Sequence, residues 1–333
     1  EMAYDKPFLT YEKQIEKLEK EYNLNCSENK EFDIELLKTI SYYDLINGYK
    51  DCFMENESFK NKVNLPTIFL FSLIDKRFQN ILFLYSVYVE TIFKTKMAYI
   101  ISKNKGIENV DYLDFNKYTI QNPKRKNRLI KTLNDITAVH LYSEDNPTKH
   151  YREKHNHIPP WILFKNVKFG TMIDLFTFLN RNEKLELIQE YDIFKTNKIT
   201  EDEKLEMFKN MISIIRKFRN KIAHNSKVIG ISILNNSLNF SNLLKIDTFK
   251  LIRKKDIKHQ INNTILFSMF VSLVYLLSPN IIHLLFTNDV INFLASGEKE
   301  LIRFYLEKAN FPMSIENRLN DLKKKLELKL DLE

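Results

Sequence analysis

The segment LEMFKNMISIIRKFRNKIAH, residues 205–224, is the clearest amphipathic helix in the chain. Apolar side chains recur at steps of three and four and polar ones fill the opposite face, which is the pattern of a helix with one buried stripe. The stripe consists of Phe208, Met211, Ile215, Phe218 and Ile222. Asn225 and Ser226 then favour a turn, so the helix that begins near Thr200 is expected to end at His224.

Arg219 and His224 stand at the end of this helix, with four residues between them. Five helical steps turn a side chain by about 140°, so only a frayed or tightened last turn would direct both groups to one point. A histidine with a pKa of about 6.5 exchanges protons near neutral pH, and an arginine offers a fork of donors that matches phosphate oxygens. Together they suit cleavage of an RNA phosphodiester, in which the 2′-hydroxyl is the nucleophile and no metal is required.

Spacing alone is weak evidence, because the pairs Arg152–His157 and Arg253–His259 are separated similarly. The 219–224 pair differs in its setting, since Asn220 follows the arginine and Ala223 precedes the histidine at the end of an amphipathic helix. The alternative is a polar helix end that His224 merely caps, an arrangement that the helix dipole favours.

The composition describes a helix-rich globular protein. Hydrophobic residues make up 44% and charged residues 28% of the 333 residues, which excludes a disordered chain, and five Gly and eight Pro leave few sharp turns. The net charge of +8 suits a polyanionic partner without identifying one. The two cysteines, Cys26 and Cys52, have no zinc spacing and are too few for a disulfide framework.

No segment of the sequence predicts export or a membrane span. The first residues lack an apolar core, and the longest apolar run, 265–277, is shorter than the roughly 20 residues of a spanning helix. We therefore expect a cytoplasmic protein in which 265–277 is a buried helix.

Basic residues gather in the region 106–160, whose polar sequence is expected to be irregular. Its densest cluster and two positions of the 205–224 helix supply the candidate RNA-binding residues, which are Lys124, Arg125, Lys126, Arg128, Arg216 and Lys221. A solvated loop explains the cluster equally well. A metal site is the third interpretation, but no recognised ligand spacing links His140, His150, His155 and His157. We expect neither a metal nor a cofactor.

Motifs in a fixed order run through nearly the whole chain. They are Lys6–Tyr11, Tyr42–Tyr49, Asp75–Lys94, Pro160–Thr171, Arg219–His224 and Phe311–Pro312. In this order they resemble the Abi-like abortive-infection proteins of bacteria, which are assigned to the HEPN superfamily of ribonucleases with its Arg-Asn-x-x-Ala-His motif. Two positions depart from the family pattern, because Lys94 stands where an arginine is common and Lys165 where we expect an acidic residue.

The resemblance implies an all-α fold, a HEPN-type helical bundle with additional N- and C-terminal helices. Within one unit, 1–333, we expect an N-terminal helical segment at 1–64, a HEPN-like core at 65–290 and C-terminal helices at 291–333. Alternation of apolar with small or polar residues over 228–238 adds one short strand or hairpin.

The resemblance also implies a metal-independent endoribonuclease toxin of antiphage defence, with Arg219 and His224 catalytic and Asn220 supporting them. In this class two motif helices commonly pair across a homodimer, and a cognate partner, a small RNA or a protein antitoxin, restrains the activity. No DNA specificity is expected. Glu90 would orient Arg219 or His224 as a nearby carboxylate, unless it is a solvent-facing residue of its helix.

Two other function classes stay open. The main one is a non-catalytic RNA-binding protein, in which the Arg/His motif contacts RNA or forms the dimer interface. The other is a metal-dependent nuclease that uses the histidines of region 140–157.

Overall fold

The chain folds almost entirely into helices. The structure is a computed structural model that describes residues 6–26, 29–60, 63–231, 237–259, 265–277, 281–297 and 299–330. Within these ranges it contains seventeen α-helices and one two-stranded antiparallel sheet. The prediction of a mainly helical fold with one short hairpin is therefore confirmed. No helix in these ranges has both the length and the apolar character needed to cross a membrane.

The elements divide into a group before the longest helix, that helix, and the helices after it. The first group is α1 (Tyr11–Tyr22), α2 (Lys30–Thr39), the π-helical turn η1 (Tyr43–Asn47), α3 (Gly48–Phe53), β1 (Met54–Glu55) and β2 (Ser58–Phe59). Then come α4 (Leu65–Lys105), α5 (Asn109–Tyr112), η2 (Phe115–Lys117), η3 (Pro123–Arg125), α6 (Lys126–Tyr142), α7 (Thr148–Lys154), α8 (Pro160–Asn166), α9 (Phe169–Thr177), α10 (Arg181–Gln189) and η4 (Asp192–Phe194). The last are α11 (Glu201–Ala223), α12 (Phe240–Ile246), α13 (Lys254–His259), α14 (Ile265–Leu276), α15 (Ile281–Ala295), α16 (Lys299–Lys308) and α17 (Ile315–Leu330).

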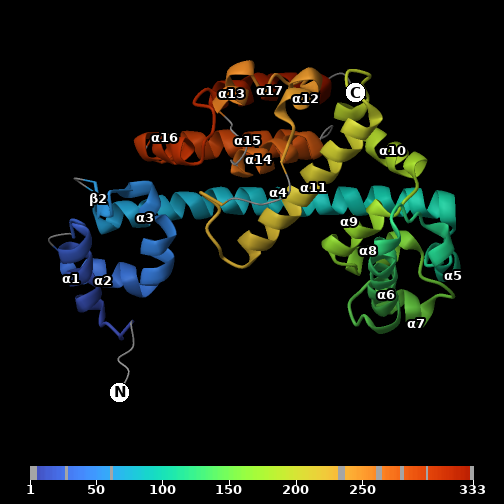
Figure 1. Ribbon diagram of the computed structural model, residues 1–333, viewed down its shortest axis with the longest axis horizontal. Coiled ribbons are helices and arrows are strands. Elements are labelled where there is room, and N and C mark those ends of the chain that lie inside the picture. The colour runs from blue at the N-terminus through green and yellow to red at the C-terminus, as the bar shows by residue number, and fades with distance from the viewer. Residues whose placement is uncertain are drawn as a thin grey trace.

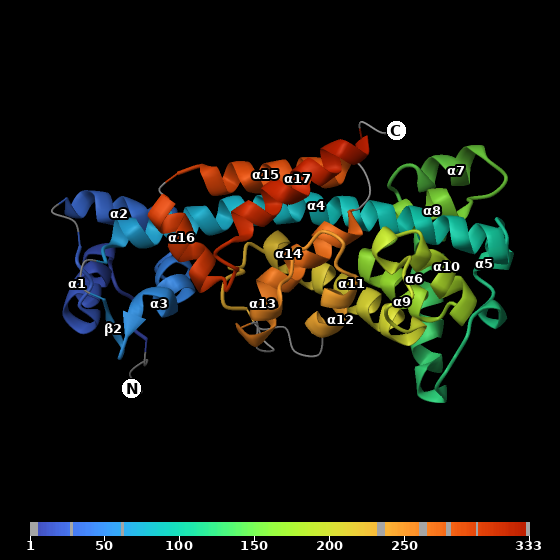
Figure 2. The same cartoon turned by 90° about the horizontal axis from the view of Figure 1, so that it is seen from above.

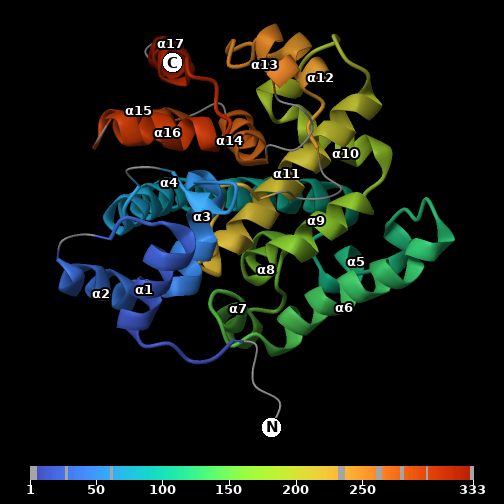
Figure 3. The ribbon, with the colours of Figure 1, turned by 60° about the vertical axis from the view of Figure 1, so that its left-hand side comes forward.

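α4 is the axis of the molecule, and with 41 residues it is about 60 Å long. Asn64 caps its N-terminus by accepting the backbone N–H of Thr67, and the helix ends before Gly106. Figures 1 and 2 show α1–α3 at one end of α4 and α5–α9 at the other. In Figure 3, α14–α17 lie on the opposite side of α4 from α6–α9. Helices therefore cover α4 from several directions, and its buried residues are not confined to one stripe.

α11 crosses α4 obliquely (Figure 1) and also packs on α9, α10 and α14. A capping box begins it, because the Thr200 side chain accepts the Glu203 backbone N–H and the Glu203 carboxylate accepts the Thr200 backbone N–H. Most of the predicted stripe is buried, namely Phe208, Met211, Ile215 and Phe218. The structure thus confirms the helix that the sequence predicted, and this helix carries the Arg/His motif across the middle of α4.

The region 106–160, which was expected to be irregular, is largely helical. It contains α5, α6 and α7, and α6 alone has 17 residues. α6 buries a narrow stripe of Leu129, Leu133 and Ile136, while its other sides are mostly polar and exposed. A helix that packs through so narrow a stripe has a weak apolar pattern, which explains the wrong prediction. The basic cluster at 124–128 consequently starts a helix and does not lie in a loop.

The short hairpin lies at β1 and β2, and the prediction of its position at 228–238 was wrong for the described part of that range. The turn residues Asn56 and Glu57 have φ of 49° and 65°. Positive φ at both positions is the type I′ geometry that matches the twist of a hairpin. Residues 226–231 form a loop in which Val228 and Ile229 are buried, and 232–236 lie outside the described residues.

Candidate functional site

Arg219 lies half-buried near the end of α11, against the middle of α4. Its Nη1 donates to Oδ1 of Asn220 at 3.2 Å, and its Nη2 is 3.4 Å from Oε2 of Glu90. Its guanidinium carbon lies 5.9 Å from the centroid of the Phe83 ring. Since a guanidinium has five N–H donors, these contacts orient Arg219 and still leave donors for a ligand.

Glu90 lies between two cations. Its Oε1 is 2.7 Å from Nζ of Lys94, one helical turn further along α4, and its Oε2 faces Arg219. The side chain of Glu90 is 13% exposed and that of Arg219 is 32% exposed, so solvent screens this pair only in part. Lys94 also donates to the backbone carbonyl oxygen of Lys165 at 3.3 Å, while the Lys165 residue is exposed. Lys94 and Lys165 are therefore joined through the backbone of α8.

Two buried polar atoms of this cluster, Nε of Arg219 and Oε2 of Glu90, have no hydrogen-bond partner within the described residues. The 3.4 Å separation of Arg219 and Glu90 also exceeds the length of a charge-assisted hydrogen bond, which is about 2.7–2.9 Å. Because buried polar groups are normally paired, unpaired ones call for an explanation such as a functional role. Glu90 therefore does not occupy all the N–H donors of Arg219, and an anionic ligand can bind to the remaining ones.

His224 follows the last residue of α11 and has the geometry of a C-cap, with φ −92° and ψ 20°. Asn225 is left-handed with φ 57°, and the Ser226 backbone N–H donates to the Lys221 carbonyl oxygen, so the helix closes at this point. The His224 residue is exposed, and within the described residues no hydrogen bond or ion pair joins it to Arg219. The structure therefore brings Arg219, Asn220 and Glu90 together and leaves His224 exposed five positions after Arg219 in the chain.

Lys76 on α4 holds the chain directly after His224. Its Nζ donates to the backbone carbonyl oxygen of Asn225 at 2.9 Å and lies 3.3 Å from Oε1 of Gln79. The cation sits at the C-terminal end of α11, where the helix dipole favours positive charge. Burial lowers the pKa of Lys76. Lys76 belongs to the Asp75–Lys94 motif, but the sequence assigned it no role at the site. The run of charges Asp75, Lys76 and Arg77 inside a largely apolar helix was the available signal.

Asp75, the residue before Lys76, is a buried carboxylate that links the loop after His224 to α3 and to α16. It accepts hydrogen bonds from Tyr49 at 2.9 Å, from Gln79 at 2.7 Å and from Tyr305 at 2.7 Å, and also from the backbone of Val228. Burial raises the pKa of Asp75, and these donors offset part of that effect. The loop after the motif is thus anchored through α4 to α3 and α16.

Three of the six candidate RNA-binding residues line one hollow. Arg125, Arg128 and Arg216 surround a cavity of about 400 Å³ together with Lys209, between α6, α9 and α11. The other three lie outside it and are exposed: Lys124 on η3, Lys126 at the start of α6 and Lys221 in the last turn of α11.

The histidines of region 106–160 are not gathered into a ligand set. Across the described residues, no group of three or more His, Cys, Asp or Glu side chains is placed to hold a metal ion. His155 instead stacks on Tyr151, with ring centroids 4.2 Å apart, and His150 meets His155 edge to face.

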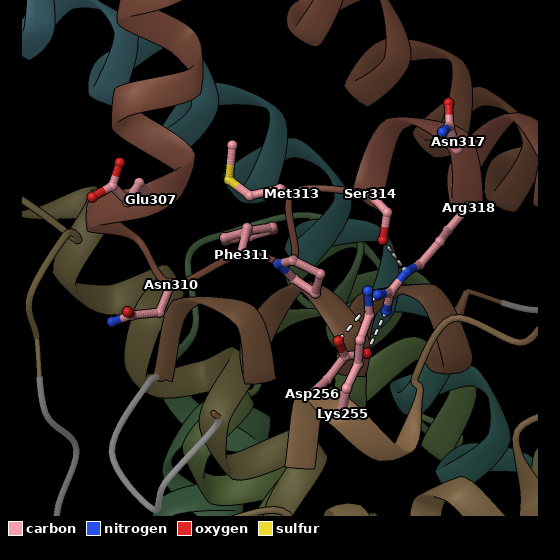
Figure 4. A pocket seen from close by; sticks show the side chains of 10 residues that line it. Lys255, Asp256, Glu307, Asn310, Phe311, Met313, Ser314, Asn317 and Arg318 are labelled. Atoms are coloured by element: carbon pink, nitrogen blue, oxygen red, sulfur yellow. Dashed lines mark hydrogen bonds and ion pairs between the residues drawn. The ribbon is translucent and has the colours of Figure 1, made fainter. Parts of the chain in front are cut away.

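A second hollow, of about 610 Å³, lies beside α13, α16 and α17 (Figure 4). In it Arg318 pairs with Asp256 and donates to the carbonyl oxygen of Leu251 at 2.7 Å. The side chains of Arg318 and Asp256 are 1% and 6% exposed, so the two charges neutralise each other inside the fold. This pair joins α13 to α17 and does not present a free charge to a ligand.

The fold and the site define an all-α protein in which a carboxylate of the long central helix contacts an arginine near the end of a crossing helix, and that helix closes at an exposed histidine. A family model described as Abi-like protein matches residues 35–230, which is more than half of the chain and includes Glu90 and the Arg219–His224 segment. The chain therefore belongs to the Abi-like protein family. No curated protein and no solved structure matches it significantly.

Proposed function

We propose that this Abi-like protein is a HEPN-type endoribonuclease that cuts RNA without a metal ion, at a site formed by Arg219, Asn220 and His224. The contacts and burial of Arg219 support the proposal most. Asn220 and Glu90 hold the guanidinium half-buried with N–H donors to spare, five positions before an exposed histidine. Membership of the Abi-like family favours a cytoplasmic role in bacterial abortive infection.

In the proposed reaction, His224 takes the proton of a 2′-hydroxyl, and the 2′-oxygen attacks the adjacent phosphorus. The P–O5′ bond breaks, a 2′,3′-cyclic phosphate forms, and the departing 5′-oxygen receives a proton. Arg219 binds the scissile phosphate and stabilises the negative charge that develops on it. Asn220 keeps the guanidinium oriented through its hydrogen bond to Nη1.

A second copy of the chain would complete the site. One chain supplies a single His224, whereas the reaction needs both a base and an acid, and the partner's histidine would protonate the 5′-oxygen. Apolar residues of α4 that face solvent support such a dimer. Leu84, Val87 and Tyr88 lie on one face of α4, because Leu84 is three and four residues before the other two, and Phe83 precedes them directly. These three residues are 39–47% exposed. An apolar group on the surface next to a site is typical of an interaction surface.

A cognate partner would restrain the activity, because uncontrolled RNA cleavage harms the host. The exposed lysines Lys124, Lys126 and Lys221 suit a small RNA as that partner, since cations on a surface neutralise phosphates. A protein antitoxin is the other candidate.

The competing function is RNA binding without cleavage, which is favoured by the lack of a hydrogen bond between His224 and Arg219 within the described residues. Purified protein free of RNA is incubated with total RNA in EDTA, beside Arg219→Ala and His224→Ala. Cleavage by wild type alone, with 2′,3′-cyclic phosphate ends, is the expected result. Losing an acid–base group costs about 10²–10⁴ in rate with little loss of affinity. Equal binding of RNA by all three proteins with no cleavage would overturn the ribonuclease proposal and favour the binding protein.

A further inference from the structure

The hollow between α6, α9 and α11 is strongly cationic. Arg125 and Arg128 reach it from η3 and α6, and Lys209 and Arg216 from α11, while Asp174 of α9 is the one carboxylate among its lining residues. The hydroxyls of Thr177 and Ser213 complete its polar wall. Four cations against one carboxylate leave an excess of positive charge around a cavity of about 400 Å³.

Neighbouring groups already orient three of these cations. Arg125 donates to Oγ1 of Thr177 at 2.6 Å and lies over the Phe178 ring at 4.7 Å, and Arg128 pairs with Asp174. Arg216 packs so closely on α9 that a Cβ at Gly170 would be 3.2 Å from its Nη1. These contacts restrict the side chains, so a ligand would meet partly preorganised donors, although the Arg128 side chain is 57% exposed.

A neighbouring hollow holds further cations beside two carboxylates, Asp202 and Glu206. It shares Arg125, Thr177 and Lys209 with the first hollow and also contains Lys184. The pKa of Lys184 is lowered to about 8, first by burial and then by the charges of Arg125 and Lys209, which the carboxylate of Glu183 offsets only in part. An anion in this region would relieve the repulsion among the cations.

One face of α11 connects the hollow to the Arg219 site. Lys209, Ser213, Arg216 and Asn220 follow each other at steps of four, three and four, so they form one stripe along the helix. Arg216 precedes Asn220 by roughly 6 Å of helix rise, and Asn220 accepts the hydrogen bond from Arg219. A single extended polyanion could therefore contact the hollow and the Arg219 site together.

We propose that this cationic hollow binds a backbone phosphate of the RNA strand that is cut at Arg219 and His224. The hollow positions the strand and does not take part in bond breaking. The inference rests on the proposed function for the identity of the strand as substrate, and it adds a second phosphate subsite to that site. Its main residues are Lys209 and Arg216 on α11 and Arg125 and Arg128 on the facing elements.

The test compares Lys209→Gln/Arg216→Gln with the matched control Arg303→Gln/Lys323→Gln, which removes one exposed arginine and one lysine from α16 and α17. Both doubles are made in full-length His224→Ala protein, so that RNA stays intact, and thermal unfolding checks that each folds. Single-stranded RNA binding is measured in EDTA over a series of salt concentrations. The hollow variant should bind about tenfold more weakly, with a log–log salt slope lower by about 0.7 for each phosphate that it no longer neutralises, and the control should match the parent. Arg128→Gln is a second variant on the facing wall and should weaken binding in the same direction.

Equal affinity and salt slope in the hollow and control variants would overturn the proposal, as would a parent protein that does not bind RNA. The same substitutions in the active protein separate this result from failure of the ribonuclease function. In that background the hollow variant should raise KM and leave kcat near the wild-type value. If wild type does not cut RNA but the hollow variant still binds more weakly, the RNA site is upheld and only the ribonuclease function fails.

Discussion

Replacing Lys76 by methionine should slow RNA cleavage without weakening RNA binding. The substitution keeps the apolar stem and removes the 2.9 Å hydrogen bond from Nζ to the Asn225 carbonyl oxygen, which holds the chain next to His224. A hydrogen bond to a charged group contributes about 1.5–3 kcal/mol, and because Lys76 is only half-buried we expect roughly 1–2 kcal/mol here. If the whole contribution positions His224, kcat should fall by roughly 5- to 30-fold.

Cleavage kinetics in EDTA with a short RNA test this expectation, with kcat and KM measured separately. Lys76→Arg retains a charged donor and should recover most of kcat. Lys103→Met removes an exposed lysine from the far end of the same helix and should leave kcat unchanged. The reasoning is refuted if Lys76→Met has the wild-type kcat, or if it loses thermal stability without any change in kcat.

Three further outcomes are expected. Glu90→Gln removes the carboxylate that orients Arg219, so cleavage should slow by about tenfold at unchanged RNA affinity, and a wild-type rate would contradict this role. Arg318→Leu leaves Asp256 buried without its cation and should lower the free energy of unfolding in urea by about 3–5 kcal/mol. The double substitution Arg318→Leu/Asp256→Leu should restore most of this loss. A loss below about 1 kcal/mol for Arg318→Leu contradicts the prediction. The pKa of Lys184 is lowered to about 8 in the folded protein, whereas the unfolded chain holds that proton up to about 10. The free energy of unfolding of wild type should therefore rise relative to that of Lys184→Met as the pH increases from about 8 to 10. A difference in unfolding free energy that stays constant over this range contradicts the prediction.

The sequence predicted α11 well because a single wide apolar stripe, ending in turn-formers, describes a helix that packs on one side. It failed at α6, where Leu129, Leu133 and Ile136 form only a narrow buried stripe in a mostly polar helix. It also misplaced the hairpin. The alternation near Val228 reflects a loop buried against Asp75, whereas the actual turn depends on positive φ at Asn56 and Glu57.

At the candidate site, the sequence indicated Arg219, Asn220 and His224 through local spacing, and Glu90 as an isolated charge in an apolar helix. It could not show that Lys76 would reach Asn225, because the two residues are 149 positions apart. The cationic hollow was equally hidden, since its lining comes from three separate segments. Packing between distant segments depends on how helices cross, and apolar periodicity carries no information about crossing.

The comparison of His224→Ala with His157→Ala tests the central claim most directly. Arg152 and His157 have the same spacing as Arg219 and His224, so the second variant controls for losing a histidine five positions after an arginine. Single-turnover cleavage of RNA in EDTA is measured for both variants and for wild type. We expect His157→Ala to cut at the wild-type rate and His224→Ala to be slower by about 10²–10⁴-fold. Equal rates for His224→Ala and wild type would contradict the assignment of the Arg219–His224 site.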